Sequence, residues 1–318
     1  MPSPIFANAP FTHEEMMATR AAEEAATLSR YVAPADVVVE DATVPVFGYN
    51  IPIRIYRPVT SVAVGSHSDG SASGGSTKLP LFIWHHGGAF MGGGLNMPEG
   101  HVTAFEVASR AQALVVSVDY RLCSDEIKFP TPQRDALAVA MWLLKNQPTL
   151  GFDKDRIFIG GGSAGACLAG SLSLMLRDGG VKIAGVIPVY AVGHFEELQP
   201  TAELQKHCDD ALGRPARLLV GHNAWLMPED QEECLGFHVW PGSESDYRDL
   251  PKHFFIHADF DILRSTGEPW AAQLREAGVQ VTEVIETGTS HGYLNELPTE
   301  NIGQDRTLSL IADFIKEN

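Results

Sequence analysis

The chain has 318 residues, of which 44% are hydrophobic and 20% are charged, a balance typical of a globular protein and not of a disordered one. The formal net charge of −17 and the lack of any lysine- and arginine-rich run argue against nucleic acids and anionic membrane surfaces as partners. The N-terminal sequence has no signal-peptide pattern, and no apolar run approaches the roughly 18 residues that suggest a membrane span.

The first third of the chain predicts a helix, two strands and a loop. Residues 12–31 form an amphipathic pattern that begins at a capping box of Thr12 and Glu15, which predicts a helix. The strand-like segments 37–47 and 51–58 predict an antiparallel pair. The serine- and glycine-rich segment 61–78 predicts a flexible loop rather than a domain boundary, because a strand pattern resumes directly after it.

From residue 79 onward, apolar strands alternate with helices. The further strands are expected at 79–84, 113–120, 156–160, 182–191, 253–258 and 281–286. The further helices are expected at 100–112, 131–146, 163–179, 266–278 and 306–318. This alternation predicts a single α/β domain over residues 1–318, with about eight strands in a mostly parallel sheet covered by helices on both faces.

Residues 193–250 interrupt this alternation with a stretch far longer than a usual connection. An insertion of this size, carrying Trp225, Met227 and Trp240, favours a lid or pocket wall over an idle loop. We expect it to form a cap together with the N-terminal segment 1–35, although the N-terminal helix could also merely pack on the surface.

The four cysteines have neither the spacing of a zinc site nor the density of a disulfide framework. They are Cys123, Cys167, Cys208 and Cys234. We expect free thiols in a reducing compartment, and therefore a cytoplasmic protein. No metal and no cofactor are predicted.

A glycine-rich turn in the segment RIFIGGGSAGACLAG fits two motifs. Gly160, Gly162 and Gly165 match the G-x-G-x-x-G of a dinucleotide phosphate cradle, whereas Gly161, Ser163 and Gly165 match the G-x-S-x-G around a nucleophilic serine. The dinucleotide interpretation requires an acidic residue at the end of the next strand, and the predicted strand there ends without one. The pattern therefore favours the nucleophile.

A nucleophilic serine needs a histidine base and an acid that orients the base, and on such a sheet they follow the serine in the order acid, then histidine. Asp259 and Asp261 follow one late strand, and His291 follows the last strand. Without these partners, Ser163 would be interpreted as a helix N-cap. The glycine-rich turn HHGGAFMGGG at residues 85–94 predicts backbone N–H groups that stabilise an oxyanion, with a flexible loop as the alternative.

Together these segments resemble the hormone-sensitive lipase family of α/β-hydrolases, the carboxylesterases with an HGGG motif. The resemblance extends from about residue 35 to the end and includes HGGAF, VVSVDYRL at 115–122, GFDKDRIFIGGGSAGACLA at 151–169, and SHGY. It implies an α/β-hydrolase fold. Further, it implies Ser163 as nucleophile, His291 as general base and Asp261 as the acid, with Asp259 as the alternative acid.

The resemblance also implies an oxyanion hole made by backbone N–H groups. The candidate donors are Gly87, Gly88, Ala89 and Ala164. Three departures from the family pattern stand out: Gly162 replaces an acidic residue before the serine, Ala89 replaces a third glycine, and CSDE follows YRL in place of Ala-Pro-Glu. The missing acid at Gly162 suggests a divergent branch with an unusual substrate.

We therefore expect a serine hydrolase that cleaves small to medium uncharged carboxylic esters through an acyl-enzyme intermediate. The candidate residues for an apolar substrate pocket are Phe90, Met91, Met16, Met17, Trp225 and Met227. Two alternatives stay open: a hydrolase of another bond (amide, lactone or carbon–carbon) on the same triad, and a non-catalytic protein that binds small molecules. The last strand, 281–286, could be an exposed sheet edge, which would allow a homodimer.

Overall fold

The computed structural model describes residues 13–59 and 78–318, and its centre is one eight-stranded sheet. The strand order is β1-β2-β4-β3-β5-β6-β7-β8. The strands are β1 (Val37–Val46), β2 (Tyr49–Pro58), β3 (Leu79–His85), β4 (Leu114–Val118), β5 (Phe152–Gly162), β6 (Gly185–Val189), β7 (Lys252–Phe260) and β8 (Val281–Ser290).

The directions of the strands agree with the prediction of a mostly parallel sheet. Strand β1 pairs antiparallel with β2, and β2 pairs antiparallel with β4. All other neighbouring pairs are parallel. The central strands read as unbroken apolar runs because both faces are covered: every residue of β4 is buried.

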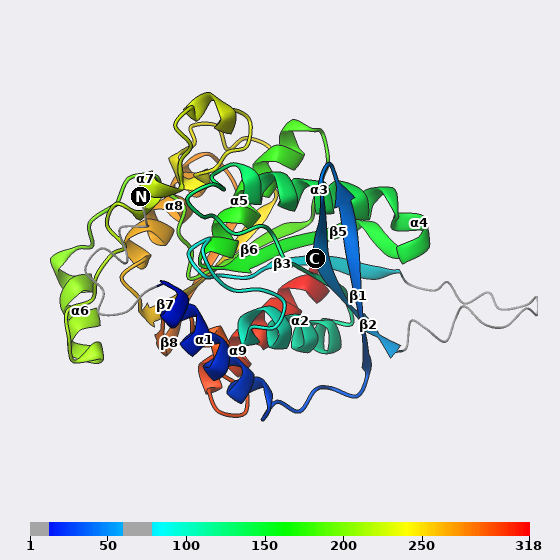
Figure 1. The fold of residues 1–318 in the computed structure, drawn as a ribbon, viewed down its shortest axis with the longest axis horizontal. Helices are drawn as coiled ribbons and strands as arrows, with labels where there is room; N and C mark the ends of the chain where they lie inside the picture. Colours follow the sequence, from blue (N-terminus) through cyan, green and yellow to red (C-terminus); the bar gives the residue numbers. More distant parts are fainter. Residues whose placement is uncertain (1–12, 60–77) are drawn as a thin grey trace, which may run out of the picture.

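Helices cover both faces of the sheet (Figure 1). Helices α2 (Pro98–Ala111) and α9 (Ile302–Glu317) pack together on one face, and α3 (Thr131–Lys145), α5 (Ala164–Asp178) and α8 (Arg264–Glu276) lie on the other. Nearly all of α5 is buried because its sequence is apolar on every side. The predicted helices of this region are thus confirmed, with ends that differ by a few residues.

Some predicted elements differ in detail or lie outside the described residues. Helix α1 spans His13–Leu28, so Thr12 of the predicted capping box is not described. The predicted loop at 61–78 lies outside the described residues except for Lys78. A short helix, α4 (Gln147–Leu150), was not predicted, because four residues that include a proline carry no helical periodicity.

The insertion at 193–250 contains helices that the sequence did not predict. They are α6 (Ala202–Leu212), α7 (His222–Leu226) and the short 3₁₀ helices η3 (Gln231–Cys234) and η4 (Pro241–Ser243). Cys208 is the buried residue of α6. Most side chains of α6 face solvent, so this helix has few buried apolar positions that a sequence pattern could reveal.

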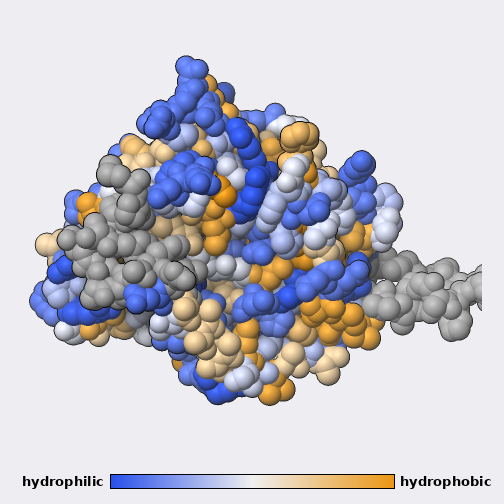
Figure 2. Space-filling model, in the orientation of Figure 1, coloured by the Kyte–Doolittle hydropathy of each residue, from blue (hydrophilic) through white to orange (hydrophobic). Residues whose placement is uncertain are grey.

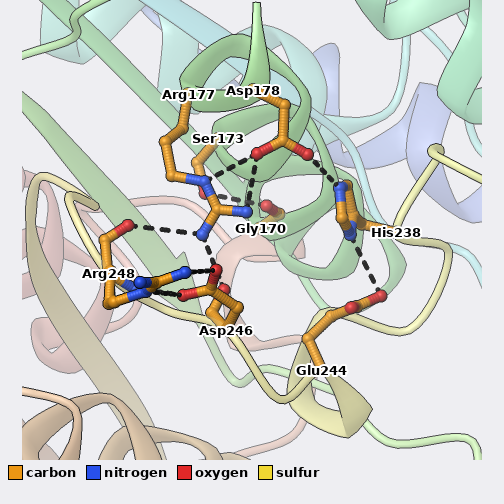
Figure 3. Close-up of polar contacts among 8 residues, drawn as sticks. All are labelled: Gly170, Ser173, Arg177, Asp178, His238, Glu244, Asp246 and Arg248. Carbon is orange, nitrogen blue, oxygen red and sulfur yellow. Dashed lines mark hydrogen bonds and ion pairs between the residues drawn. The ribbon is translucent and has the colours of Figure 1, made fainter.

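Polar contacts fasten the end of the insertion to the last turn of α5 (Figure 3). The His238 ring lies between two carboxylates, with Nε2 2.8 Å from Asp178 and Nδ1 3.1 Å from Glu244. The Arg177 guanidinium donates to the backbone carbonyl oxygen of Asp246 at 2.6 Å. These ion pairs and hydrogen bonds add to the burial of Val239, Trp240 and Tyr247 in holding the end of the insertion.

The surface drawn in Figure 2 intersperses hydrophilic and hydrophobic residues. Among residues 13–59 and 78–318, no helix combines the length and the apolar character needed to cross a bilayer. All four cysteines are buried and free.

Candidate active site

The turn between β5 and α5 holds Ser163 in a strained conformation. Its φ of 54° and ψ of −114° are unfavourable for any residue with a side chain. The turn is tight because α5 begins against the end of β3: a side chain at Gly165 would overlap the His85 carbonyl oxygen, and one at Gly161 would overlap Gly165. Because Ser163 makes no side-chain capping bond, the N-cap interpretation is not needed to explain this serine.

The Ser163 hydroxyl begins a chain of two hydrogen bonds. Its Oγ lies 3.0 Å from His291 Nε2, and His291 Nδ1 lies 2.8 Å from Asp261 Oδ2. Asp261 is 2% exposed and follows β7, and His291 follows β8. A serine, a base and an orienting carboxylate within hydrogen-bond reach are the arrangement that activates a serine hydroxyl.

The alternative acid, Asp259, points elsewhere. Its carboxylate lies 2.9 Å from His207 Nε2 and accepts a hydrogen bond of 2.9 Å from the Gly288 N–H. Asp259 and Asp261 are only two positions apart in the sequence, so their order in the chain does not indicate which one is the acid. The structure does, because Asp261 is the carboxylate that contacts His291.

The surroundings of His291 favour its protonated form. Desolvation in the cavity wall lowers the pKa of the ring, but the Asp261 carboxylate beside it, with a smaller contribution from Glu99, raises the pKa above its ordinary value of 6.5. The side chain is 38% exposed, so it can still reach a substrate. Such an environment stabilises the imidazolium that forms when His291 accepts a proton.

The turn after β3 carries three consecutive residues with positive φ, Gly88 at 120°, Ala89 at 54° and Phe90 at 60°. The Ala89 conformation is strained for a residue with a Cβ. It is supported from the insertion, because His222 Nε2 lies 2.8 Å from the Ala89 carbonyl oxygen. The replacement of glycine by Ala89 therefore keeps the left-handed backbone.

One predicted oxyanion donor is wrong. The N–H of Gly87 already donates to the carboxylate of Glu99, so it cannot also point at a substrate oxygen. Gly88, Ala89 and Ala164 remain the candidate donors, and all three border a cavity that reaches Ser163.

Glu99, near the start of α2, is a buried carboxylate beside the turn at Ser163. It is 2% exposed, and its two oxygens accept hydrogen bonds from the Gly87 N–H and, at 2.7 Å, from the Tyr190 hydroxyl. Burial raises the pKa of Glu99, and these two donors oppose the rise. A Cβ built on Gly162 would lie 2.6 Å from Glu99 Oε1, so this carboxylate fills the space beside Gly162.

Two cavities of very different size meet at Ser163. The larger has a volume of about 950 Å³ and is bordered by α1, by the turn after β3 and by residues 212–219 of the insertion. The smaller has a volume of about 60 Å³ and is bordered by Val192, Leu226 and Trp240, among others. Both segments expected to form a cap thus contribute to the cavity walls.

The predicted pocket residues divide into two groups. Met91 borders the larger cavity and Phe90 the smaller one. Trp225 and Met227 border neither cavity: Trp225 stacks on His222 and covers the Lys128 ammonium, and Met227 accepts a hydrogen bond from the Trp240 ring nitrogen. They pack instead of facing substrate, so their prediction as pocket residues was wrong. The side chains of Met16 and Met17 lie outside the described parts.

No metal centre or phosphate cradle is found in this region. In the described parts of the chain, no group of three or more His, Cys, Asp or Glu residues could hold a metal ion. The buried Glu99 carboxylate lies beside the glycine turn, where it would repel a phosphate. The G-x-G-x-x-G match is therefore a coincidence of adjacent glycines.

Several residues at the site were missed by the sequence analysis. The buried Glu99 and Tyr190 form a polar cluster with the partly buried Asn295, and His222 supports Ala89. The only indication in the sequence was Gly162, which stands where the family pattern has an acidic residue. Its presence suggests that another segment supplies the carboxylate. No local pattern indicates which segment supplies it.

Comparisons with known proteins agree with this geometry. A family model described as alpha/beta hydrolase fold matches residues 82–295. The arylesterase of Saccharolobus solfataricus is 28% identical over 285 residues, which cover 89% of this chain and 86% of that protein. Carboxylesterase NlhH of Mycobacterium tuberculosis is 30% identical over 265 residues, which cover 81% of this chain and 76% of that protein.

Among solved structures, an esterase of Pyrobaculum calidifontis matches with a TM-score of 0.79 and 28% identity, covering 97% of this chain and 94% of that one. The match extends over the whole sheet and its helices. The chain therefore belongs to the α/β-hydrolase family of carboxylesterases related to hormone-sensitive lipase, and it is an esterase.

Proposed function

We propose that this chain hydrolyses small to medium uncharged carboxylic esters through an acyl-enzyme intermediate on Ser163. The observation that carries the proposal is the pair of hydrogen bonds, 3.0 Å and 2.8 Å long, that joins Ser163 to His291 and His291 to Asp261. A cofactor is not needed for this chemistry, because the three side chains and the backbone supply the base, the nucleophile and the charge stabilisation.

The reaction has two halves. His291 Nε2 takes the hydroxyl proton as Ser163 Oγ bonds to the carbonyl carbon, and the electron pair of the C=O bond moves to oxygen. The N–H groups of Gly88, Ala89 and Ala164 stabilise this oxyanion, while Asp261 stabilises the imidazolium. The C=O bond then re-forms as the ester C–O bond breaks, and the imidazolium gives its proton to the leaving alcohol. Water attacks the acyl-enzyme in the same way, with His291 as base, and releases the acid and free Ser163.

The two cavities support a preference for esters with one short side. The smaller cavity, at about 60 Å³, has room for a short group only. The larger cavity, about 950 Å³, admits a much bigger acyl or alcohol group. Its charged border residues have both signs, which favours an uncharged substrate: Arg20, Glu23, Glu24, Glu99, Arg214, Arg217 and Asp261.

We also assign α1 and the insertion 193–250 the role of a cap, because both border the larger cavity and lie outside the sheet. The anchoring of the cap by Arg30, which donates to Glu300 at 2.9 Å, supports this role. A cap would restrict which esters reach Ser163 without taking part in the chemistry.

Labelling with a fluorophosphonate probe tests the nucleophile. The folded protein should label at Ser163, and Ser163→Ala, with an unchanged melting temperature, should not. If the folded wild-type protein fails to label, the proposed mechanism is wrong and a non-catalytic binding function takes its place.

A panel of nitrophenyl esters of increasing acyl length, run beside matched amides and lactones, tests the scissile bond. We expect turnover of the esters, with the highest kcat/KM for a substrate that has one short side. If the labelled enzyme cleaves none of the esters but cleaves an amide or lactone, the triad serves a different bond.

We further propose a homodimer through β8 and a location in the cytoplasm. Strand β8 ends the sheet, and Ile285 on it is 46% exposed, which supports pairing of two edges. Four buried free thiols support a reducing compartment. Sedimentation of wild type and Ile285→Lys tests the dimer, and cell fractionation tests the location.

A further inference from the structure

Gly162, the residue before Ser163, has no side chain, but Glu99 of α2 occupies the space beside it. A Cβ on Gly162 would lie 2.6 Å from Glu99 Oε1 and 2.7 Å from Tyr190 Cε2. Glu99 comes from α2, which follows the turn that carries Gly88 and Ala89. The space beside Gly162 could hold either a side chain at position 162 or one from α2. In this chain, the Glu99 carboxylate of α2 occupies it.

This carboxylate is connected to both halves of the catalytic machinery. On one side, Glu99 Oε1 accepts from the N–H of Gly87, the residue that precedes Gly88 and Ala89. On the other side, Glu99 Oε2 accepts from the Tyr190 hydroxyl at 2.7 Å and from Asn295 at 3.5 Å.

The second side leads to the general base. The Tyr190 ring packs against the His291 ring with centroids 5.1 Å apart, and Asn295 also donates to the carbonyl of Gly292 at 3.1 Å, next to His291 in the chain. The backbone of Glu99 is also fixed, because its carbonyl oxygen accepts a hydrogen bond of 3.0 Å from Trp84 Nε1. A buried acceptor with satisfied oxygens and a fixed backbone is a rigid support.

We propose that Glu99 is a positioning residue for ester hydrolysis. Through the Gly87 N–H it orients the turn that carries Gly88 and Ala89, and through its second oxygen it holds Tyr190 against His291. The proposal rests on the oxyanion donors and the triad proposed above. Glu99 borders the larger cavity, and in the proposed role it acts by fixing the backbone from which Gly88 and Ala89 donate.

Single substitutions separate geometry from charge. Glu99→Ala removes both contacts and should lower kcat about 100-fold with little change in KM, as loss of an oxyanion donor does. Glu99→Gln can still accept from Gly87 and donate to the Tyr190 oxygen, so its kcat should fall less. Because Glu99 contributes to the raised pKa of His291, the acid limb of the kcat/KM profile of Glu99→Gln should move to lower pH.

The control is Glu106→Gln, another buried glutamate of α2, whose contacts are Tyr31 and Arg110 rather than the active site. It should leave kcat and the pH profile unchanged. An aryl trifluoromethyl ketone, which adds to the serine hydroxyl to form an oxyanion, provides a second readout. Its affinity should fall in Glu99→Ala in parallel with kcat and stay constant in Glu106→Gln.

A pair of changes tests the competition for space directly. Gly162→Asp alone should be harmful because its side chain collides with both Glu99 and the Tyr190 ring. Glu99→Ala/Gly162→Asp should have a higher kcat than Gly162→Asp, since the collision with Glu99 is removed. Residues in contact show such non-additivity, and independent residues do not.

Melting temperatures and fluorophosphonate labelling accompany each variant. Additive effects in the double variant, or wild-type kcat and ketone affinity in Glu99→Ala, would overturn the positioning role. If the wild type does not label, the proposed mechanism has failed. If the wild type labels and hydrolyses esters but Glu99→Ala does so equally well, the Glu99 proposal alone has failed.

Discussion

The turn at Ser163 and the insertion at 193–250 border the same cavity, but different contacts hold them in place. At the turn, backbone packs on backbone: glycines lie against the His85 carbonyl and nearly all of α5 is buried. In the insertion, Cys208 is the buried residue of α6, while the end of the segment is held both by burial of Val239 and Trp240 and by ion pairs with α5 (Figure 3).

The difference separates two tasks. Catalysis needs atoms held to within fractions of an ångström, which close packing provides. Selection of a substrate needs walls whose shape can vary, and a largely exposed helix such as α6 tolerates change. We therefore expect substitutions at the turn to abolish activity and substitutions in the cap to redistribute it among substrates.

The largest effect is expected at Gly165. Because an added methyl group would overlap the His85 carbonyl oxygen, Gly165→Ala should destabilise the fold by about 3 kcal/mol or more and remove activity. The matched control is Gly179→Ala, at the other end of α5, where the nearest atom to the new methyl is 3.4 Å away. Urea unfolding should place the control within about 0.5 kcal/mol of wild type. Equal stabilities for the two variants would contradict the packing argument.

A smaller but still large effect is expected at the acid. Asp261→Asn should lower kcat by about 10⁴-fold, since the amide no longer stabilises the imidazolium. Asp259→Asn, two residues away, loses contacts with His207 and Gly288 only and should retain near-wild-type kcat. Steady-state kinetics on one nitrophenyl ester measures both, and the reverse ranking would reassign the acid.

A substitution in α1 should change selectivity. Thr27 is half-buried and borders the larger cavity, so Thr27→Trp should reduce kcat/KM for long acyl esters by about tenfold and leave the shortest ester nearly unaffected. Ala22→Trp, on the exposed face of the same helix, is the control. A uniform loss across all chain lengths would show that α1 supports the site itself and is not a wall.

The smallest effect concerns the anchor of the insertion. Glu244 and Asp178 outweigh burial and raise the pKa of His238 above its ordinary value of 6.5. The stabilisation is therefore fully present below pH 6.5 and is lost as the pH rises through the folded-state pKa. His238→Gln should lower stability by about 1 kcal/mol in acid and less in alkali. A melting-temperature difference that grows with pH would contradict this.

Most of the fold could be predicted because its strands and helices have strong periodic patterns. All eight strands, the antiparallel start and the helices that cover the sheet agree with the sequence analysis. The helices of the insertion were missed because their faces are polar and their lengths short, as in the five-residue α7. Their positions depend on contacts with distant elements, such as those of α6 with β7 and of η4 with α5 and α8, which no local pattern records.

The candidate site was predictable where chemistry follows chain order. Ser163, Asp261 and His291 each follow a strand, so their meeting at one edge of the sheet could be inferred. The roles of Gly87 and Glu99 could not, because a single hydrogen bond between them decides which N–H groups stay free. Trp225 is likewise a residue type that often lines pockets, but it packs on His222 and Lys128.

The unequal cavities on the two sides of Ser163 have a stereochemical consequence. An ester whose longer group fits only the larger cavity, and whose oxygen must face Gly88 and Ala89, presents a single prochiral face of its carbonyl to Ser163 Oγ. The tetrahedral intermediate then forms in one handedness. A racemic phosphonate of the same shape should therefore be consumed one enantiomer first, which makes the reaction a kinetic resolution.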